Sequence, residues 1–166
     1  MRVCFLILLT VLSVTPLASA AEIIGAWMVS VEESALDNTK SASLVTVGKG
    51  NDKHMLGIRC SDGQAALIFG TGDYMGIAKR TEVQTLDYKL DDGRVDSLYI
   101  TPVPGGSAVQ LSKGGATPER FIKRLMDGKR LVVRVTPYQK AAVEMIFDLS
   151  DLKGAMAPAA KVCGVE

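Results

Sequence analysis

Histidine, cysteine and aromatic residues are all scarce in this sequence. Its 166 residues include one histidine, three cysteines and one tryptophan, and aromatic residues make up 5% of the chain. A single histidine excludes a histidine-rich metal centre, and it leaves a Ser-His-Asp triad dependent on His54 alone. No G-x-S-x-G nucleophile motif accompanies that histidine. We therefore expect His54 to be an exposed turn residue, and we predict no metal, no cofactor and no catalytic residue.

Excess charge of one sign and long apolar runs are lacking as well. The chain has 19 basic and 18 acidic residues, which argues against a strong overall field toward nucleic acid or an anionic membrane. The apolar run Val3–Val14 is shorter than the roughly 20 residues of a membrane-spanning helix. Polar Thr10 and Ser13 interrupt this run. We expect neither nucleic-acid binding nor a stable membrane span.

The first twenty residues have the pattern of an export signal. Arg2 precedes the apolar run, and Pro16 is followed by the small residues Ala18-Ser19-Ala20. We predict a signal peptide at residues 1–20 that is cleaved after Ala20, and one exported domain at residues 21–166. A single arginine and a short apolar core are typical of a bacterial signal, so the expected location is the periplasm.

Cleavage after Ala20 leaves an even pair of cysteines, because Cys4 lies within the signal. In an oxidising compartment we expect Cys60 and Cys163 to form a disulfide that holds the C-terminal segment to the middle of the chain. The alternative is two free thiols, one of them a nucleophile. C-x-x-C spacing and a basic flank at Cys163 are both lacking, and either feature would support that alternative.

Short β-prone segments separated by turn residues predict a β-rich domain. The sixteen glycines fall mostly between these segments, and Ser61-Asp62-Gly63 predicts a tight hairpin turn. The same interpretation treats Asp73, Asp91 and Asp92 as turn residues rather than as a catalytic carboxylate pair. The predicted strands are 26–31, 43–47, 55–60, 65–69, 85–90, 96–101, 108–111, 131–136 and 143–149.

Two helices are predicted in the C-terminal third of the chain. Thr117-Pro118 supplies an N-cap and a proline at the first helical position, and Asp127-Gly128 ends this helix. Residues 150–162 favour a weaker helix that Pro158 ends or kinks. We therefore predict an α+β fold that is mainly antiparallel β, either a sandwich or a partly open barrel, with one or two short helices.

The sequence offers two candidate contacts for a partner. Gly70–Gly76 lacks the Lys-Ser/Thr of a phosphate-binding loop, so we interpret it as a glycine-rich connection whose Tyr74 and Met75 contact a partner if it has a role. The second candidate is the basic face of the first helix, which could bind an anionic glycan or an acidic protein. Interspersed acidic residues also allow a simple solvated face. Its basic residues are Arg120, Lys123 and Arg124, followed by Lys129 and Arg130.

Several motifs, in this order, resemble the small periplasmic accessory proteins of the type VI secretion-associated family. They span most of residues 21–166. The motifs are Trp27 near the start, Leu56–Cys60, Tyr88–Gly93, Phe121–Leu125, Leu131–Pro137, and Phe147–Leu152 followed by Cys163. The resemblance implies a helper without catalytic residues.

The first functional hypothesis is therefore a non-enzymatic periplasmic binding or assembly protein, with an envelope or secretion-system protein as its partner. The second is an inhibitor of a lysozyme-type cell-wall hydrolase, since such inhibitors are also small, exported, β-rich and disulfide-closed. The third is an enzyme that acts on the cell wall or on glycans. The oligomeric state and the identity of the partner stay open.

Overall fold

A computed structural model describes residues 21–76, 84–112 and 117–166 of the chain. The predicted signal at residues 1–20 lies outside the described residues. The described strands are β1 Glu22–Ile24, β2 Trp27–Glu33, β3 Lys40–Gly48, β4 Asn51–Ser61, β5 Gln64–Gly70, β6 Gln84–Leu90, β7 Asp96–Pro102, β8 Ala108–Leu111, β9 Arg130–Val135 and β10 Val143–Asp148. The helices are α1 Pro118–Met126, α2 Leu152–Met156 and α3 Ala160–Cys163.

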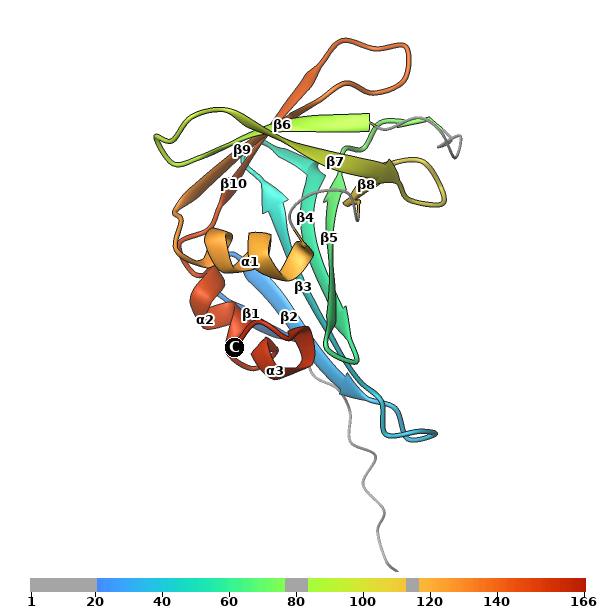
Figure 1. The fold of residues 1–166 in the computed structure, drawn as a ribbon, viewed down its shortest axis with the longest axis vertical. Coiled ribbons are helices and arrows are strands. Elements are labelled where there is room, and N and C mark those ends of the chain that lie inside the picture. Colours follow the sequence, from blue (N-terminus) through green and yellow to red (C-terminus); the bar gives the residue numbers. More distant parts are fainter. Residues whose placement is uncertain (1–20, 77–83, 113–116) are drawn as a thin grey trace, which may run out of the picture.

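The strands form one antiparallel sheet that does not close (Figure 1). Their order is β1-β2-β3-β4-β5-β8-β7-β6-β9-β10. The chain runs from β2 to β5 by successive hairpins, crosses to β6, and returns through β7 and β8 to pair with β5. This confirms the predicted α+β, mainly antiparallel class. The short strand β1 was not predicted, because three residues show too little alternation to be recognised.

The hairpin between β4 and β5 has the predicted turn. Asp62 and Gly63 have φ angles of 51° and 75°, and Ser61 is paired with Gln64 across the turn. Two central residues with positive φ form the turn whose twist matches that of the flanking strands. The sequence therefore determines the register of this hairpin locally.

The three helices lie against one face of β2–β5, which we call the inner face (Figure 1). Helix α1 packs on β5, α2 on β2, and α3 on β3 and β4. Helix α1 begins as predicted, because the Thr117 hydroxyl accepts a hydrogen bond from the Arg120 backbone N–H. Its buried side is formed by Phe121, Ile122 and Leu125. None of the described helices has the length and hydrophobicity needed to cross a bilayer.

The predicted C-terminal helix is two short helices. Helix α2 ends before Pro158, and α3 begins at Ala160 and carries Cys163. Cys163 and Cys60 form the expected disulfide, which joins residues 103 apart in sequence. The bond connects α3 to β4 and holds this helix against the inner face of the sheet.

At the far end of the sheet, β10 approaches the turn between β3 and β4. The Lys49 backbone N–H donates to the Ile146 carbonyl at 2.8 Å, and Lys49 Nζ lies 3.2 Å from the Asp148 carboxylate. Hydrogen bonds from Ser150, followed by the contact with Lys49, lower the pKa of Asp148 to about 2. The contacts of Lys49 hold the last strand of the sheet close to its middle strands.

Candidate docking surfaces

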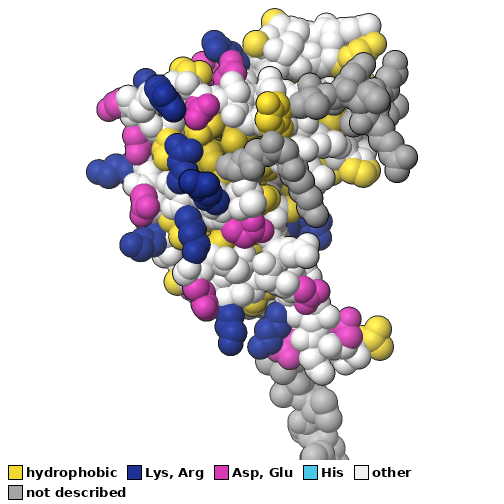
Figure 2. Space-filling model, viewed as in Figure 1, with side chains coloured by type: hydrophobic (Ala, Val, Ile, Leu, Met, Phe, Trp, Pro, Cys, Tyr) yellow, Lys and Arg dark blue, Asp and Glu magenta, His cyan; other side chains and the backbone are white. Residues whose placement is uncertain are grey.

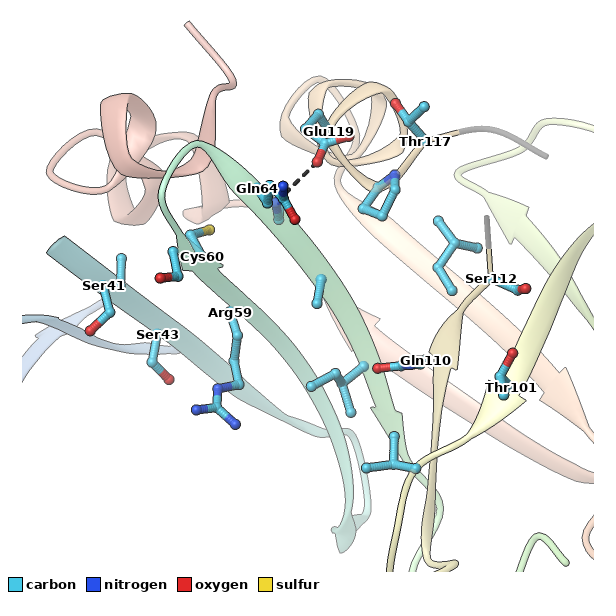
Figure 3. Close-up of a pocket in the computed structure, with 18 of the residues that line it drawn as sticks. Ser41, Ser43, Arg59, Cys60, Gln64, Thr101, Gln110, Ser112, Thr117 and Glu119 are labelled. Carbon is cyan, nitrogen blue, oxygen red and sulfur yellow. Dashed lines mark hydrogen bonds between the residues drawn. The ribbon is translucent and has the colours of Figure 1, made fainter. Parts of the chain in front are cut away.

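The outer face of β2–β5, opposite the helices, contains an open groove of about 1450 Å³ (Figure 3). Strands β3, β4 and β5 form its floor. Strands β7 and β8 and the first turn of α1 form one side. The residues that the structure places on its floor include Ser41, Ser43, Arg59, Ser61, Gln64 and Ala66.

The groove is open because neighbouring strands place small side chains opposite one another. Ser43 is paired with Ser30 on β2 and with Arg59 on β4, and Arg59 is paired with Ala66 on β5. In an antiparallel sheet, directly opposed residues project on the same face. Short side chains on both sides of Arg59 therefore leave space around its guanidinium.

Arg59 is an exposed cation in the centre of this floor. In residues 21–76, 84–112 and 117–166, no acidic side chain forms an ion pair with it. Its cross-strand neighbours, Ser43 and Ala66, are neutral. Arg59 could not be recognised as a candidate from the sequence, because its position facing a groove depends on the curvature and pairing of the whole sheet.

The edge of β5 that borders the groove is closed by α1. Strand β5 pairs with β4 along its length, but with β8 only through Ile68–Gly70. Where β8 is absent, the Ala65 backbone N–H donates to Glu119 Oε1 at 3.0 Å. Leu67 is fully buried. Glu119 therefore occupies a strand edge, a role that its place among the basic residues of α1 did not reveal.

Next to the groove, the outer face carries a cluster of exposed apolar side chains. Met28, Val47 and Met55 are 53%, 55% and 45% exposed. Met28 is paired with Val45, and Val47 is paired with Met55. Gly57 on β4 lies between Val45 and Ile68, because it is paired with both. We call Met28, Val45, Val47, Met55 and Ile68 the methionine patch.

The predicted partner contacts in the glycine-rich connection have different outcomes. Tyr74 is half exposed, and its ring packs edge-to-face on Tyr138 with 6.1 Å between centroids. Its role in partner contact stays a prediction. The expectation of an exposed Met75 is wrong, because this side chain is 2% exposed and belongs to the core. The turn between β7 and β8 fixes it there, since the Met75 N–H donates to the Gly106 carbonyl.

Two of the three basic side chains predicted on α1 have partners within the protein. Lys123 Nζ donates to the carbonyl oxygen of Glu166, and Arg124 Nη1 donates to the Tyr88 hydroxyl at 3.0 Å. The Arg124 guanidinium also lies 5.8 Å from the centre of the Tyr88 ring. Figure 2 shows Lys and Arg side chains over α1 with acidic side chains among them. Partner binding by Arg120, Lys123 and Arg124 stays a prediction.

The expectation of an exposed His54 is wrong. Strand β4 begins at Asn51, so His54 lies within the strand and is 8% exposed. Its Nε2 is 3.1 Å from the Asn51 side-chain amide. The turn interpretation of Asp91 is confirmed, since it lies in the turn between β6 and β7 with a φ of 50°. Its carboxylate accepts hydrogen bonds from the backbone N–H groups of Lys129 and Arg130. Among the described residues, no three His, Cys, Asp or Glu side chains form a metal-binding group.

Comparison with known proteins found no matching family model, no matching curated protein and no matching solved structure. The resemblance to the type VI secretion-associated family therefore stays a prediction from the sequence motifs.

Proposed function

We propose that this protein is a non-enzymatic binding or assembly protein of the bacterial periplasm that holds an envelope or secretion-system protein against the methionine patch. The observation that carries this proposal is the exposure of Met28, Val47 and Met55 side by side on the sheet face opposite the described helices. Clustered exposed apolar side chains are typical of protein interaction sites.

The chemistry of the patch suits a protein partner. Methionine is unbranched and adapts its shape to an irregular apolar surface, so Met28 and Met55 could accommodate the side chains of a partner. The backbone beneath them is continuously paired between β2, β3 and β4. A surface already held in its binding conformation loses little conformational entropy when the complex forms.

The proposed compartment follows from the disulfide together with the sequence of the first twenty residues. The Cys60–Cys163 bond is consistent with an oxidising environment outside the cytoplasm. The export signal and the family resemblance are sequence predictions, and they are the basis for a place in a secretion machine. The alternatives, a hydrolase inhibitor and a wall- or glycan-acting enzyme, also stay predictions.

The test is capture of a partner by purified protein, followed by measurement of its affinity. A partner recovered from the bacterial envelope by the unmodified protein is purified and titrated against Val47→Ser and Met55→Ser. Each change removes apolar area from the interface, so binding should weaken about tenfold per substitution. Thermal unfolding should change little, because both side chains are already about half exposed in the folded protein.

Leu36→Ser is the matched control. Leu36 is an almost fully exposed apolar residue in the connection between β2 and β3, outside the methionine patch. Its substitution should leave partner binding unchanged. Equal affinity of the unmodified protein and both patch variants, or an equal loss with Leu36→Ser, would contradict the proposal. Inhibition of lysozyme by the purified protein would favour the inhibitor hypothesis instead.

A further inference from the structure

The groove beside the methionine patch has polar chemistry and is too large for an ordinary small-molecule site. Its volume of about 1450 Å³ exceeds the roughly 300–1,000 Å³ typical of small-molecule pockets. It extends across the sheet from Ser30 on β2 to Thr101 on β7. A groove that crosses several strands in this way fits a segment of a polymer.

The groove presents hydrogen-bonding groups that the fold does not use. The hydroxyls of Ser41 and Ser43 and the amides of Gln64 and Gln110 line it (Figure 3). Among the described residues, none of these four side chains has a hydrogen-bond partner. Hydroxyls and amides both donate and accept, so they match a ligand that carries many hydroxyl groups.

Arg59 favours a ligand that carries a negative charge. Its planar guanidinium can donate two parallel hydrogen bonds to one carboxylate. Two acidic residues, Glu32 and Glu119, also line the groove. They disfavour a densely charged polyanion such as nucleic acid, whose binding depends on several cations. The combination fits a chain whose carboxylates are widely spaced.

A polypeptide fits this groove less well than a glycan. An extended peptide gains most of its affinity by hydrogen bonding to an open strand edge. Here the Ala65 N–H is already bonded to Glu119, and Leu67 is fully buried. We therefore propose that the groove binds a glycan strand with widely spaced carboxylates, one of which pairs with Arg59. This site shares only Ile68 with the methionine patch, and the proposal does not depend on a protein partner at that patch.

Calorimetric titration of the purified protein with two oligosaccharides of equal length tests whether the groove prefers a glycan that carries carboxylates. A hyaluronan hexasaccharide has a carboxylate on every second sugar, whereas an N-acetylglucosamine hexamer has none. The first should bind at least about tenfold more tightly, because a hydrogen-bonded charge pair contributes that much. Arg59→Gln should abolish this preference.

Two variants locate the ligand. Arg94→Gln removes the same charge from the connection between β6 and β7, outside the groove, and should bind hyaluronan like the unmodified protein. Ser43→Phe fills the groove floor without changing charge, and should also weaken binding about tenfold or more. Thermal unfolding verifies that each variant is folded. If Ser43→Phe does not fold, Arg59→Gln still tests the proposal.

Three results would overturn the proposal. The first is no binding of the hyaluronan hexasaccharide at millimolar concentration. The second is binding that Arg59→Gln leaves unchanged. The third is tighter, Arg59-dependent binding of a hexapeptide with alternating glutamate and serine, which would assign the groove to an acidic polypeptide. Arg59→Gln should leave partner capture by the methionine patch intact, so failure of this proposal is distinguishable from failure of the proposed function.

Discussion

The two faces of β2–β5 differ sharply although the same strands build both. On β4, Leu56, Ile58 and Cys60 point inward and are buried, whereas Met55 and Arg59 point outward and are exposed. The helices in the described part of the chain pack on the inner face. Burial on that face stabilises the fold, whereas the outer side chains Met55 and Arg59 bury less of their surface. Stability and binding should therefore respond to different substitutions on the same strand.

The largest loss of stability is expected at the disulfide on the inner side. Replacing both Cys60 and Cys163 with alanine opens a loop of 103 residues, which should lower the free energy of unfolding by about 3–5 kcal/mol. Urea unfolding with tryptophan fluorescence measures the change. Unmodified protein in reducing agent should lose a similar amount. Equal urea midpoints for the variant and the oxidised protein would show that the bond contributes little to stability.

Adjacent residues on β3 compare the two faces directly. Leu44 is fully buried on the inner face, so Leu44→Ala should lower the free energy of unfolding by about 2–5 kcal/mol. Its neighbour Ser43 faces the groove, and Ser43→Ala should change that free energy by less than about 0.5 kcal/mol. Urea unfolding of the two variants measures both changes in free energy. Similar losses for the two variants would mean that the outer face is also structural.

A smaller, pH-dependent effect is expected at Asp148, where β10 approaches the turn between β3 and β4. Its pKa of about 2, set mainly by hydrogen bonds from Ser150, lies below the unfolded value of about 3.9. The ionised carboxylate therefore stabilises the fold at neutral pH, and this stabilisation is lost progressively as pH falls from about 5 through the folded pKa of about 2.

Asp148 is more than a third exposed, so solvent screening limits the effect to about 1 kcal/mol or less. Asp148→Asn should lower stability at pH 7 by this amount and by clearly less at pH 2, where the carboxyl is about half protonated in the folded protein, as measured by urea unfolding. A loss of the same size at both pH values would mean that the contribution does not depend on ionisation.

Features governed by neighbouring residues or by the cysteine count were predictable from the sequence. The turn at Asp62-Gly63, the N-cap of α1 at Thr117 and the Cys60–Cys163 bond were all expected and are present. His54 was placed wrongly because strand length depends on pairing, and β4 extends back to Asn51. Met75 was placed wrongly because its burial depends on the turn between β7 and β8, some thirty residues later in the chain.

The sequence by itself determined the β-rich class, the turns and the availability of two cysteines, because each follows from short-range pattern or from composition. The tertiary structure alone decided which apolar side chains remain exposed. Leu44, Val45 and Val47 are all apolar, so residue type does not distinguish the face that the helices cover. Pairing of separate strands also brings Ser43, Arg59 and Ala66 into one row. The groove exists because long-range pairing, rather than local propensity, places small side chains around one cation.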